Sequence, residues 1–221
     1  MKYIYHHLGL GDHIICNGMV RHFKEIFNEV SVFCKPQYYN NIKYMYRDDE
    51  HIHVLPIGED LDVERYIVNN SLQNDTIKIG FDELNKYKHL NLTFDEAFYF
   101  IAKIPFDYRF SKFKFDRNYE VEENIYQKLN PNNDKYIFTH NIDKTKVRSD
   151  LKIIENPVEY CIFDILKLIE NAEEVHLMES SVKCLVNSFK FDKPKFFYHK
   201  YVRNYPEYNN SKGLNNFTII Y

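Results

Sequence analysis

The residues best suited to chemistry lie together near the start of the 221-residue chain. The segment His6-His-Leu-Gly-Leu-Gly-Asp-His13 combines two glycines, one carboxylate and three imidazoles. Gly9 and Gly11 permit positive φ and close approach of a ligand. Asp12 has two interpretations that spacing leaves open. It is either the N-cap of the helix that follows, or a general base that takes a proton from a substrate with His13 beside it.

The same histidines raise the question of a metal site. Imidazoles and a carboxylate together can complete the coordination sphere of zinc or iron. Adjacent residues of a strand point to opposite faces, however, so His6 and His7 cannot easily bind one ion. We therefore expect neither a metal ion nor another cofactor.

A second group of polar residues lies near position 180. Glu179, Ser180 and Ser181 follow a predicted strand and begin a predicted helix. Hydroxyls and free backbone N–H groups at a helix start can hold a phosphate, and a carboxylate can accept hydrogen bonds from a ribose. An ordinary serine N-cap produces the same pattern, so both interpretations stay open.

Strands and helices that alternate must position these groups. In the first half, β-prone runs occupy 3–5, 30–33, 52–55 and 76–79. The helix behind the glycine turn has apolar residues at helical spacing, namely Ile15, Met19, Phe23, Ile26 and Phe27. This alternation favours a parallel sheet of Rossmann type, in which the glycine turn lies at a strand's carboxyl end, where ligands bind.

The second half repeats the alternation. Its predicted strands are 136–139, 152–154, 175–177 and 196–198, with an edge strand at 217–221. We interpret 81–115 as a connector, although a helix packed on the first sheet and followed by a surface loop fits equally well. We expect an α/β fold of two Rossmann-like domains, residues 1–115 and 116–221, whose parallel sheets face a central cleft.

Composition narrows the classes of partner. Hydrophobic residues make up 44% and charged residues 28%, as in globular proteins. A net charge of -3 provides no basic field, so nucleic acid is not an expected partner. No apolar run long enough for a transmembrane segment and no signal peptide are present. Four widely spaced cysteines without a C-x-x-C pair indicate reduced thiols, and we expect a cytoplasmic protein.

The run Leu8-Gly-Leu-Gly-Asp-His-Ile14, followed by Arg21 and then a strand, resembles the N-terminal signature of a glycosyltransferase family. These are the ADP-heptose:lipopolysaccharide heptosyltransferases and related GT-B glycosyltransferases. The resemblance is good over about the first 35 residues and only a pattern beyond them. It implies a compact GT-B architecture, with Asp12 as the general base in the loop between the first strand and the first helix.

The resemblance also implies a reaction, the inverting, metal-independent transfer of a hexose or heptose from a nucleotide-sugar donor to an acceptor hydroxyl. The acceptor, a glycan or glycolipid, would bind the first half, near Gly9 and Gly11. The nucleotide would bind the second half at Glu179, Ser180 and Ser181.

A basic loop of the second half is our preferred diphosphate clamp. It contains His140, Lys144, Lys146 and Arg148. GT-B enzymes neutralise the leaving diphosphate with basic side chains and helix dipoles instead of a metal, and Arg148 is foremost in that role here. A solvated charged loop is the alternative.

The main alternative function is a nucleotide- or phosphate-binding α/β protein without transferase chemistry. The glycine turn lacks the third glycine of a dinucleotide fingerprint and the Gly-Lys-Ser/Thr ending of a P-loop. A glycolipid acceptor would require peripheral membrane contact, but no clearly basic amphipathic helix is evident.

Overall fold

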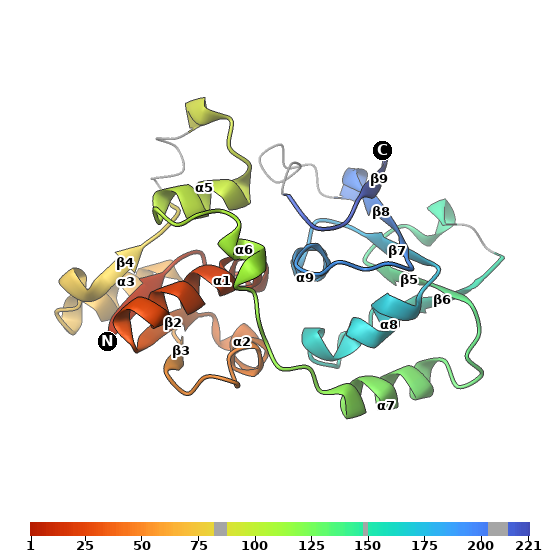
Figure 1. Cartoon of the computed structure of the whole chain (residues 1–221), viewed down its shortest axis with the longest axis horizontal. Helices are drawn as coiled ribbons and strands as arrows, with labels where there is room; N and C mark the ends of the chain where they lie inside the picture. Colours follow the sequence, from red (N-terminus) through yellow and green to blue (C-terminus); the bar gives the residue numbers. More distant parts are fainter. Residues whose placement is uncertain (82–87, 148–149, 203–211) are drawn as a thin grey trace. The chain divides into compact units, whose positions relative to one another are not determined.

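The computed structural model describes residues 1–81, 88–147, 150–202 and 212–221, and the chain forms two compact units (Figure 1). The first unit comprises Met1–Asp116 together with Lys212, and the second begins at Arg117 and includes the C-terminal strand.

The first unit is built on a parallel sheet. Its described strands are β1 (Lys2–Tyr5), β2 (Val30–Cys34), β3 (Ile52–Pro56) and β4 (Thr76–Lys78), in the order β3-β2-β1-β4. Every pair among them is parallel. The strand order reverses beside β1, so the loops after β1 and β4 flank a topological switch point, the usual ligand site of such sheets.

The helices of this unit are α1 (Leu10–Phe27), α2 (Tyr39–Met45), α3 (Asp60–Asn69), α5 (Phe94–Ile101) and α6 (Tyr108–Ser111). Short 3-10 turns occupy Pro36–Tyr38, Gln73–Asp75 and Lys88–Leu90. α1 packs on β2 and is covered by α5 and α6, so most of its circumference is buried. The segment 81–115 belongs to the first unit, and the predicted packed helix is α5. The surface loop expected after it was wrong, because α6 follows there and packs on α1 with Arg109 buried.

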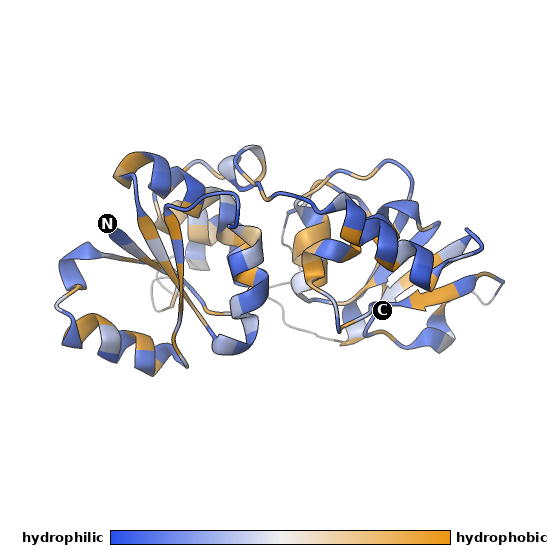
Figure 2. Ribbon diagram, turned by 90° about the horizontal axis from the view of Figure 1, so that it is seen from below, coloured by the Kyte–Doolittle hydropathy of each residue, from blue (hydrophilic) through white to orange (hydrophobic). Residues whose placement is uncertain are grey.

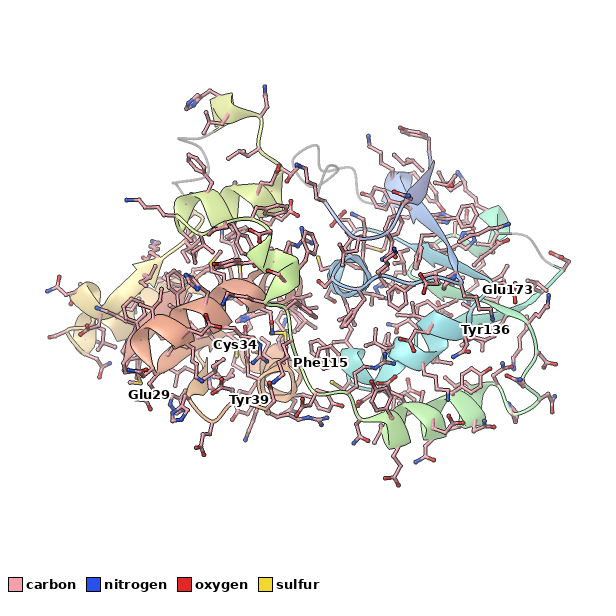
Figure 3. All side chains as sticks on the ribbon, in the orientation of Figure 1. Glu29, Cys34, Tyr39, Phe115, Tyr136 and Glu173 are labelled. Carbon is pink, nitrogen blue, oxygen red and sulfur yellow. The ribbon has the colours of Figure 1, made fainter. Side chains whose placement is uncertain are left out.

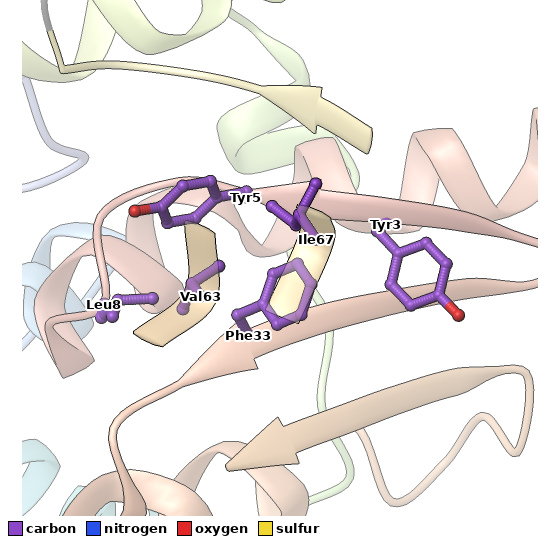
Figure 4. Packing of buried hydrophobic residues seen from close by; sticks show 6 residues of the cluster. All are labelled: Tyr3, Tyr5, Leu8, Phe33, Val63 and Ile67. Carbon is purple, nitrogen blue, oxygen red and sulfur yellow. The ribbon is translucent and has the colours of Figure 1, made fainter. Parts of the chain in front are cut away.

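One face of the first sheet packs against α3. The cluster joins Tyr3 and Tyr5 of β1, Leu8, Phe33 of β2, and Val63 and Ile67 of α3 (Figure 4). Every other residue of a strand faces the same side, which is why Tyr3 and Tyr5 point to one cluster. The ring of Tyr5 meets that of Phe33 edge-on at 5.9 Å. This packing holds the carboxyl ends of β1 and β2 in a defined register.

Arg21, part of the sequence motif, ties α1 to two other segments. Its guanidinium donates to the Asp48 carboxylate at 2.7 Å and to the Lys114 carbonyl oxygen at 2.7 Å. Deeper in the unit, Arg109 of α6 forms a fully buried ion pair with Asp95 of α5. Breaking a buried ion pair leaves an unpaired charge in the protein interior, which is strongly destabilising. We therefore assign the Arg21 and Arg109 contacts to the architecture of the unit.

The second unit has a parallel sheet of its own. The described strands are β5 (Tyr136–His140), β6 (Lys152–Glu155), β7 (Glu174–Leu177), β8 (Lys195–His199) and β9 (Phe217–Ile220), in the order β6-β5-β7-β8-β9. Here the order reverses beside β5, so the switch point lies between the loops after β5 and β7.

The helices of the second unit are α7 (Tyr119–Leu129), α8 (Leu166–Asn171) and α9 (Ser181–Asn187). Short 3-10 turns occupy Lys144–Lys146, Ile162–Ile165 and Lys200–Val202. Tyr136, at the start of β5, donates its hydroxyl to the Leu168 carbonyl oxygen of α8 at 2.6 Å (Figure 3). Figure 2 shows hydrophobic residues on the strands of both units and a mixture of hydrophobic and hydrophilic residues along the helices.

The predicted α/β fold with two parallel Rossmann-like sheets is confirmed, and the predicted strand at 217–221 is the edge strand β9. That the sheets face a cleft stays a prediction.

One residue predicted to lie on the buried face of the first helix was wrong. Ile26 is 54% exposed, because it lies on the solvent side of the last turns of α1. No helix within the described ranges is both long and apolar enough to cross a bilayer.

Gly18 allows α6 to approach α1. A Cβ atom at Gly18 would lie 2.0 Å from the Tyr108 backbone carbonyl oxygen, far inside contact distance. Alanine is worth about 1 kcal/mol more than glycine in a helix, but overpacking against rigid backbone costs about 1–3 kcal/mol. We expect Gly18→Ala to lower the free energy of unfolding in urea, whereas Ile26→Ala, at an exposed position of α1, changes it by less than about 0.5 kcal/mol. A stabilised Gly18→Ala variant would contradict this packing.

Candidate functional site

The carboxyl end of β1 leads directly into α1 through the glycine turn. Gly9 is the N-cap of α1, with φ -72° and ψ 147°, and Asp12 is the third helical residue. The N-cap interpretation of Asp12 is therefore wrong. Asp12 instead accepts a hydrogen bond from the backbone N–H of Gly9, the reciprocal half of a capping box. A Cβ at Gly9 would lie 2.6 Å from Asp12 Oδ2, so the carboxylate needs glycine there.

Burial sets the protonation state of Asp12. The residue is partly exposed, but protein atoms surround its carboxyl, and this desolvation raises the pKa of the carboxyl to about 7. The N–H groups of Gly9 and of Asp12 itself oppose that shift by stabilising the anion. The negative charge of Asp60 adds to it. A carboxyl with this pKa can hold or release a proton near neutral pH, as a general base must.

The loops after β1 and β4 are joined beside this carboxyl. The Phe81 backbone N–H donates to His7 Nε2 at 3.0 Å, and the rings of His7 and Phe81 are 4.7 Å apart. Gly80 and Phe81 have φ values of 95° and 58°. Positive φ in phenylalanine is strained and persists only where the surroundings impose it. The switch point of the first sheet therefore has a fixed backbone.

His6 and His13 lie deeper than Asp12. Both are buried, their rings meet at 4.4 Å, and His6 Nδ1 donates to the His7 carbonyl oxygen at 2.7 Å. Burial lowers the pKa of His6 to about 4 and that of His13 well below its usual value. His13, a predicted partner of Asp12, thus lies within the protein interior as a neutral imidazole.

Metal-ligating groups do not converge here. Whereas His6 packs on His13, His7 packs against Phe81, Phe94 and Phe98. Among the residues that the structure describes, no three His, Cys, Asp or Glu side chains gather as a metal site would require. The Asp60 carboxylate is engaged by the Tyr5 hydroxyl at 3.0 Å.

In the second unit, the loop after β5 has its own hydrogen bonds. His140 ends β5, where the Asn156 amide donates to its Nδ1 at 3.1 Å, and burial lowers its pKa to about 4. Lys144 pairs with Glu155 at 2.6 Å, and the Lys146 ammonium lies 4.1 Å from the centre of the Tyr201 ring. Arg148 lies outside the described residues.

The loop after β7 begins α9. Ser180 is its N-cap, and the hydroxyl accepts from the Lys183 backbone N–H at 3.3 Å, so the capping interpretation is confirmed for this residue. Glu179 pairs with the Lys183 ammonium at 2.6 Å, and both side chains are largely buried. Ser181 is the first helical residue, partly exposed beside them.

Sequence reasoning missed Lys183 and the pair His176 and His199. Lys183 lies four residues after Glu179, a spacing that favours an ion pair on a helix. The signal for His199 is its position: it directly follows a predicted strand, as His140 does, and His140 was identified in that way.

Two solved structures are similar over the whole chain. A glycosyl transferase family 9 protein from Veillonella parvula DSM 2008 has a TM-score of 0.59 at 5% identity, covering 99% of this chain and 86% of its own. The E. coli ADP-heptose lps heptosyltransferase II also has a TM-score of 0.59, at 9% identity, covering 100% of this chain and 90% of its own. The chain has the fold of these glycosyltransferases. At such identities the likeness shows this glycosyltransferase fold alone.

No protein-family model and no curated protein sequence matches the chain. Its place among the glycosyltransferase folds therefore rests on the structure, and its chemistry must be argued from the side chains at the two sheet edges.

The raised pKa of Asp12 predicts a pH dependence of stability. Folded Asp12 keeps its proton up to about pH 7, whereas an unfolded aspartic acid loses it near 3.8. Between these two pH values the folded state therefore binds more protons than the unfolded state. The stability that protonated Asp12 contributes is lost as pH rises through this range. Asp12→Asn, which is neutral throughout, should gain on the order of 1–3 kcal/mol relative to wild type between pH 4 and pH 8, measured by urea unfolding.

Asp62→Asn is the matched control. Asp62 is also the third residue of a helix and accepts from the Glu59 backbone N–H, but it is about half exposed. This variant should follow the wild-type pH profile. Parallel profiles for Asp12→Asn and wild type would show that the Asp12 carboxyl is not desolvated.

Proposed function

We propose that this chain is an inverting, metal-independent glycosyltransferase that moves a hexose or heptose from a nucleotide-sugar donor to an acceptor hydroxyl. The observation that supports it is Asp12, a carboxyl with a pKa near 7 at the switch point of the first sheet. The fold shared with solved glycosyltransferases is consistent with this chemistry.

Asp12 would act as the general base. Its carboxylate takes the proton of the acceptor hydroxyl while that oxygen attacks the anomeric carbon of the donor sugar. The bond from this carbon to the diphosphate oxygen breaks in the same displacement, which inverts the configuration and releases a nucleoside diphosphate. Gly9 leaves room for the Asp12 carboxylate itself, and the acceptor would lie beside Gly9 and Gly11. Buried His13 would support α1 by packing on His6.

The second unit would bind the donor. Lys144, Lys146 and Arg148 would neutralise the diphosphate, and neutral His140 at the end of β5 would offer a hydrogen bond. Glu179, Ser180 and Ser181 would seat the nucleotide at the start of α9. Lys183 holds Glu179 in place for a ribose hydroxyl. No cofactor has a role in this scheme.

The partners follow from the reaction. The name of the E. coli structure states an ADP-heptose donor and an lps acceptor for that protein. For this chain we propose only the class, a sugar nucleotide as donor and a glycan or glycolipid as acceptor. Sugar nucleotides are cytoplasmic metabolites, so we propose a cytoplasmic protein with peripheral membrane contact if the acceptor is a lipid.

Donor binding is testable by thermal shift. A ligand that binds only the folded state at about 100 times its dissociation constant adds about 2.7 kcal/mol to stability. We expect ADP, GDP or UDP, or a corresponding sugar nucleotide, to raise the melting temperature, with inorganic sulfate at equal ionic strength as the control. No shift with any nucleotide would exclude both the transferase and the non-catalytic nucleotide-binding alternative.

Catalysis is tested separately at Asp12. Asp12→Asn should keep the nucleotide-induced thermal shift and lose about 10²- to 10⁴-fold in the rate of sugar transfer, since a general base contributes that much. The rate is followed as nucleoside diphosphate release from the bound sugar nucleotide with glycan acceptors. Asp62→Asn should retain full rate. If wild type binds nucleotide but transfers nothing, the non-catalytic alternative is favoured, and an unchanged rate in Asp12→Asn would refute the base.

A further inference from the structure

A continuous chain of hydrogen bonds runs through the second unit to the edge of its sheet. Glu174 Oε2 lies 3.3 Å from His176 Nε2, and His176 Nδ1 lies 2.8 Å from His199 Nε2. His199 Nδ1 in turn lies 2.9 Å from the Tyr201 hydroxyl. Glu174, His176 and His199 are buried, and only Tyr201 is partly exposed. The chain thus connects a buried carboxylate to a surface phenol.

With neutral imidazoles the chain has one consistent direction. The Glu174 carboxylate can only accept, so His176 carries its hydrogen on Nε2 and accepts through Nδ1. His199 then donates from Nε2 and accepts through Nδ1, and the Tyr201 hydroxyl donates to it. In this state the Tyr201 oxygen offers lone pairs, but no hydrogen, to the surroundings.

Tyr201 stands where the diphosphate is proposed to bind. It follows β8, so it lies at the same sheet edge as the loops after β5 and β7. The Lys146 ammonium is 4.1 Å from the centre of its ring, which links Tyr201 to the proposed clamp. A phosphate held by Lys146 would therefore meet the Tyr201 hydroxyl.

We propose that Tyr201 positions the donor diphosphate, and that binding reverses the hydrogen-bond chain through uptake of one proton by the His176–His199 pair. This inference rests on the proposed function and adds a residue and a proton linkage to it. A phosphate oxygen needs a hydrogen-bond donor. Reversal of the chain makes the Tyr201 hydroxyl, which otherwise offers only lone pairs at the surface, such a donor.

The protons balance along the chain. One proton enters from solvent and binds the Tyr201 oxygen. The former Tyr201 hydrogen moves to His199 Nδ1, the His199 Nε2 hydrogen moves to His176 Nδ1, and the His176 Nε2 hydrogen stays in place. His176 then holds hydrogens on both nitrogens, donating to Glu174 and to His199 Nε2. His199 remains neutral with its hydrogen on Nδ1, which donates to the Tyr201 oxygen. The Tyr201 hydrogen points to the phosphate, and the added charge lies on His176 beside the Glu174 carboxylate.

The charges around the chain favour neutrality when no anion is present. Burial lowers the pKa of His176, and burial together with the charges of His176 and Lys146 lowers the pKa of His199 to about 4. Glu174 opposes the shift at His176, and Asp143 opposes it at His199. Phe197 stacks on His176 at 4.4 Å and contributes no charge. A bound diphosphate would compensate Lys146 and shift the balance toward the protonated pair.

The test counts protons taken up on binding. We would titrate the full chain with whichever of ADP, GDP and UDP binds, by calorimetry at pH 6 in two buffers of different ionisation enthalpy. Because the terminal phosphate itself titrates near pH 6, the readout is the difference between wild type and variants. Wild type should take up at least about 0.5 proton more per nucleotide than Tyr201→Phe, and its affinity should rise up to about tenfold more per unit fall in pH.

Tyr201→Phe keeps the ring under Lys146 and removes only the hydroxyl, and His199→Gln removes the imidazole that relays the proton between Tyr201 and His176. Both should lose the additional uptake. Tyr160→Phe is the matched control, since Tyr160 also lies beside a lysine, with its hydroxyl 2.8 Å from Lys128 Nζ, and should behave as wild type. If nucleotide binds and Tyr201→Phe takes up as many protons as wild type, the inference is overturned while the proposed function stands. If no nucleotide binds, the proposed function itself fails.

Discussion

The constraint on which the rest of this structure depends is parallel strand pairing. Every strand pair in the described part of both sheets is parallel, so each chain segment that leaves a strand does so at the same edge of its sheet. Each return requires a crossover, which places helix starts at that edge as well. Asp12 is the third residue of a helix that follows β1, and Ser180 caps a helix that follows β7. The topology alone brings these polar groups to ligand-binding edges.

Burial then decides what those groups can do. Desolvation disfavours whichever form is charged, so it raises the pKa of Asp12 and lowers the pKa values of His6, His13, His140 and His199. One physical cause thus leaves a carboxyl able to exchange a proton near pH 7 and imidazoles that are neutral there. The neutral histidines serve as hydrogen-bonding groups with one donor and one acceptor each. That property allows His176 and His199 to form a directed chain.

The sequence predicted the architecture because its signals are local. Short β-branched runs alternating with helical patterns identified the strands of both sheets to within about two residues. The site was only partly predictable, because its decisive features depend on contacts distant in sequence. That Gly9, not Asp12, is the N-cap follows from backbone angles that no residue pattern specifies. The burial of His13 depends on packing against His6 between the sheet and α1, and the pairing of His176 with His199 requires the β7–β8 register.

The two sheet edges carry different charges and therefore favour different ligands. The first edge has Asp12 and Asp60, and its lysines Lys35 and Lys78 are paired with Glu59 and Glu64. The carboxylates at this edge would repel a diphosphate but not a neutral hydroxyl. At the second edge, Lys146 lies against the Tyr201 ring and near the Asp143 carboxylate, and Lys144 and Lys183 form ion pairs with Glu155 and Glu179. An anion can exchange into the exposed Lys144–Glu155 pair at modest cost because exposed ion pairs are weak. The acid at one edge and the cations at the other thus favour assigning the acceptor to the first unit and the donor to the second.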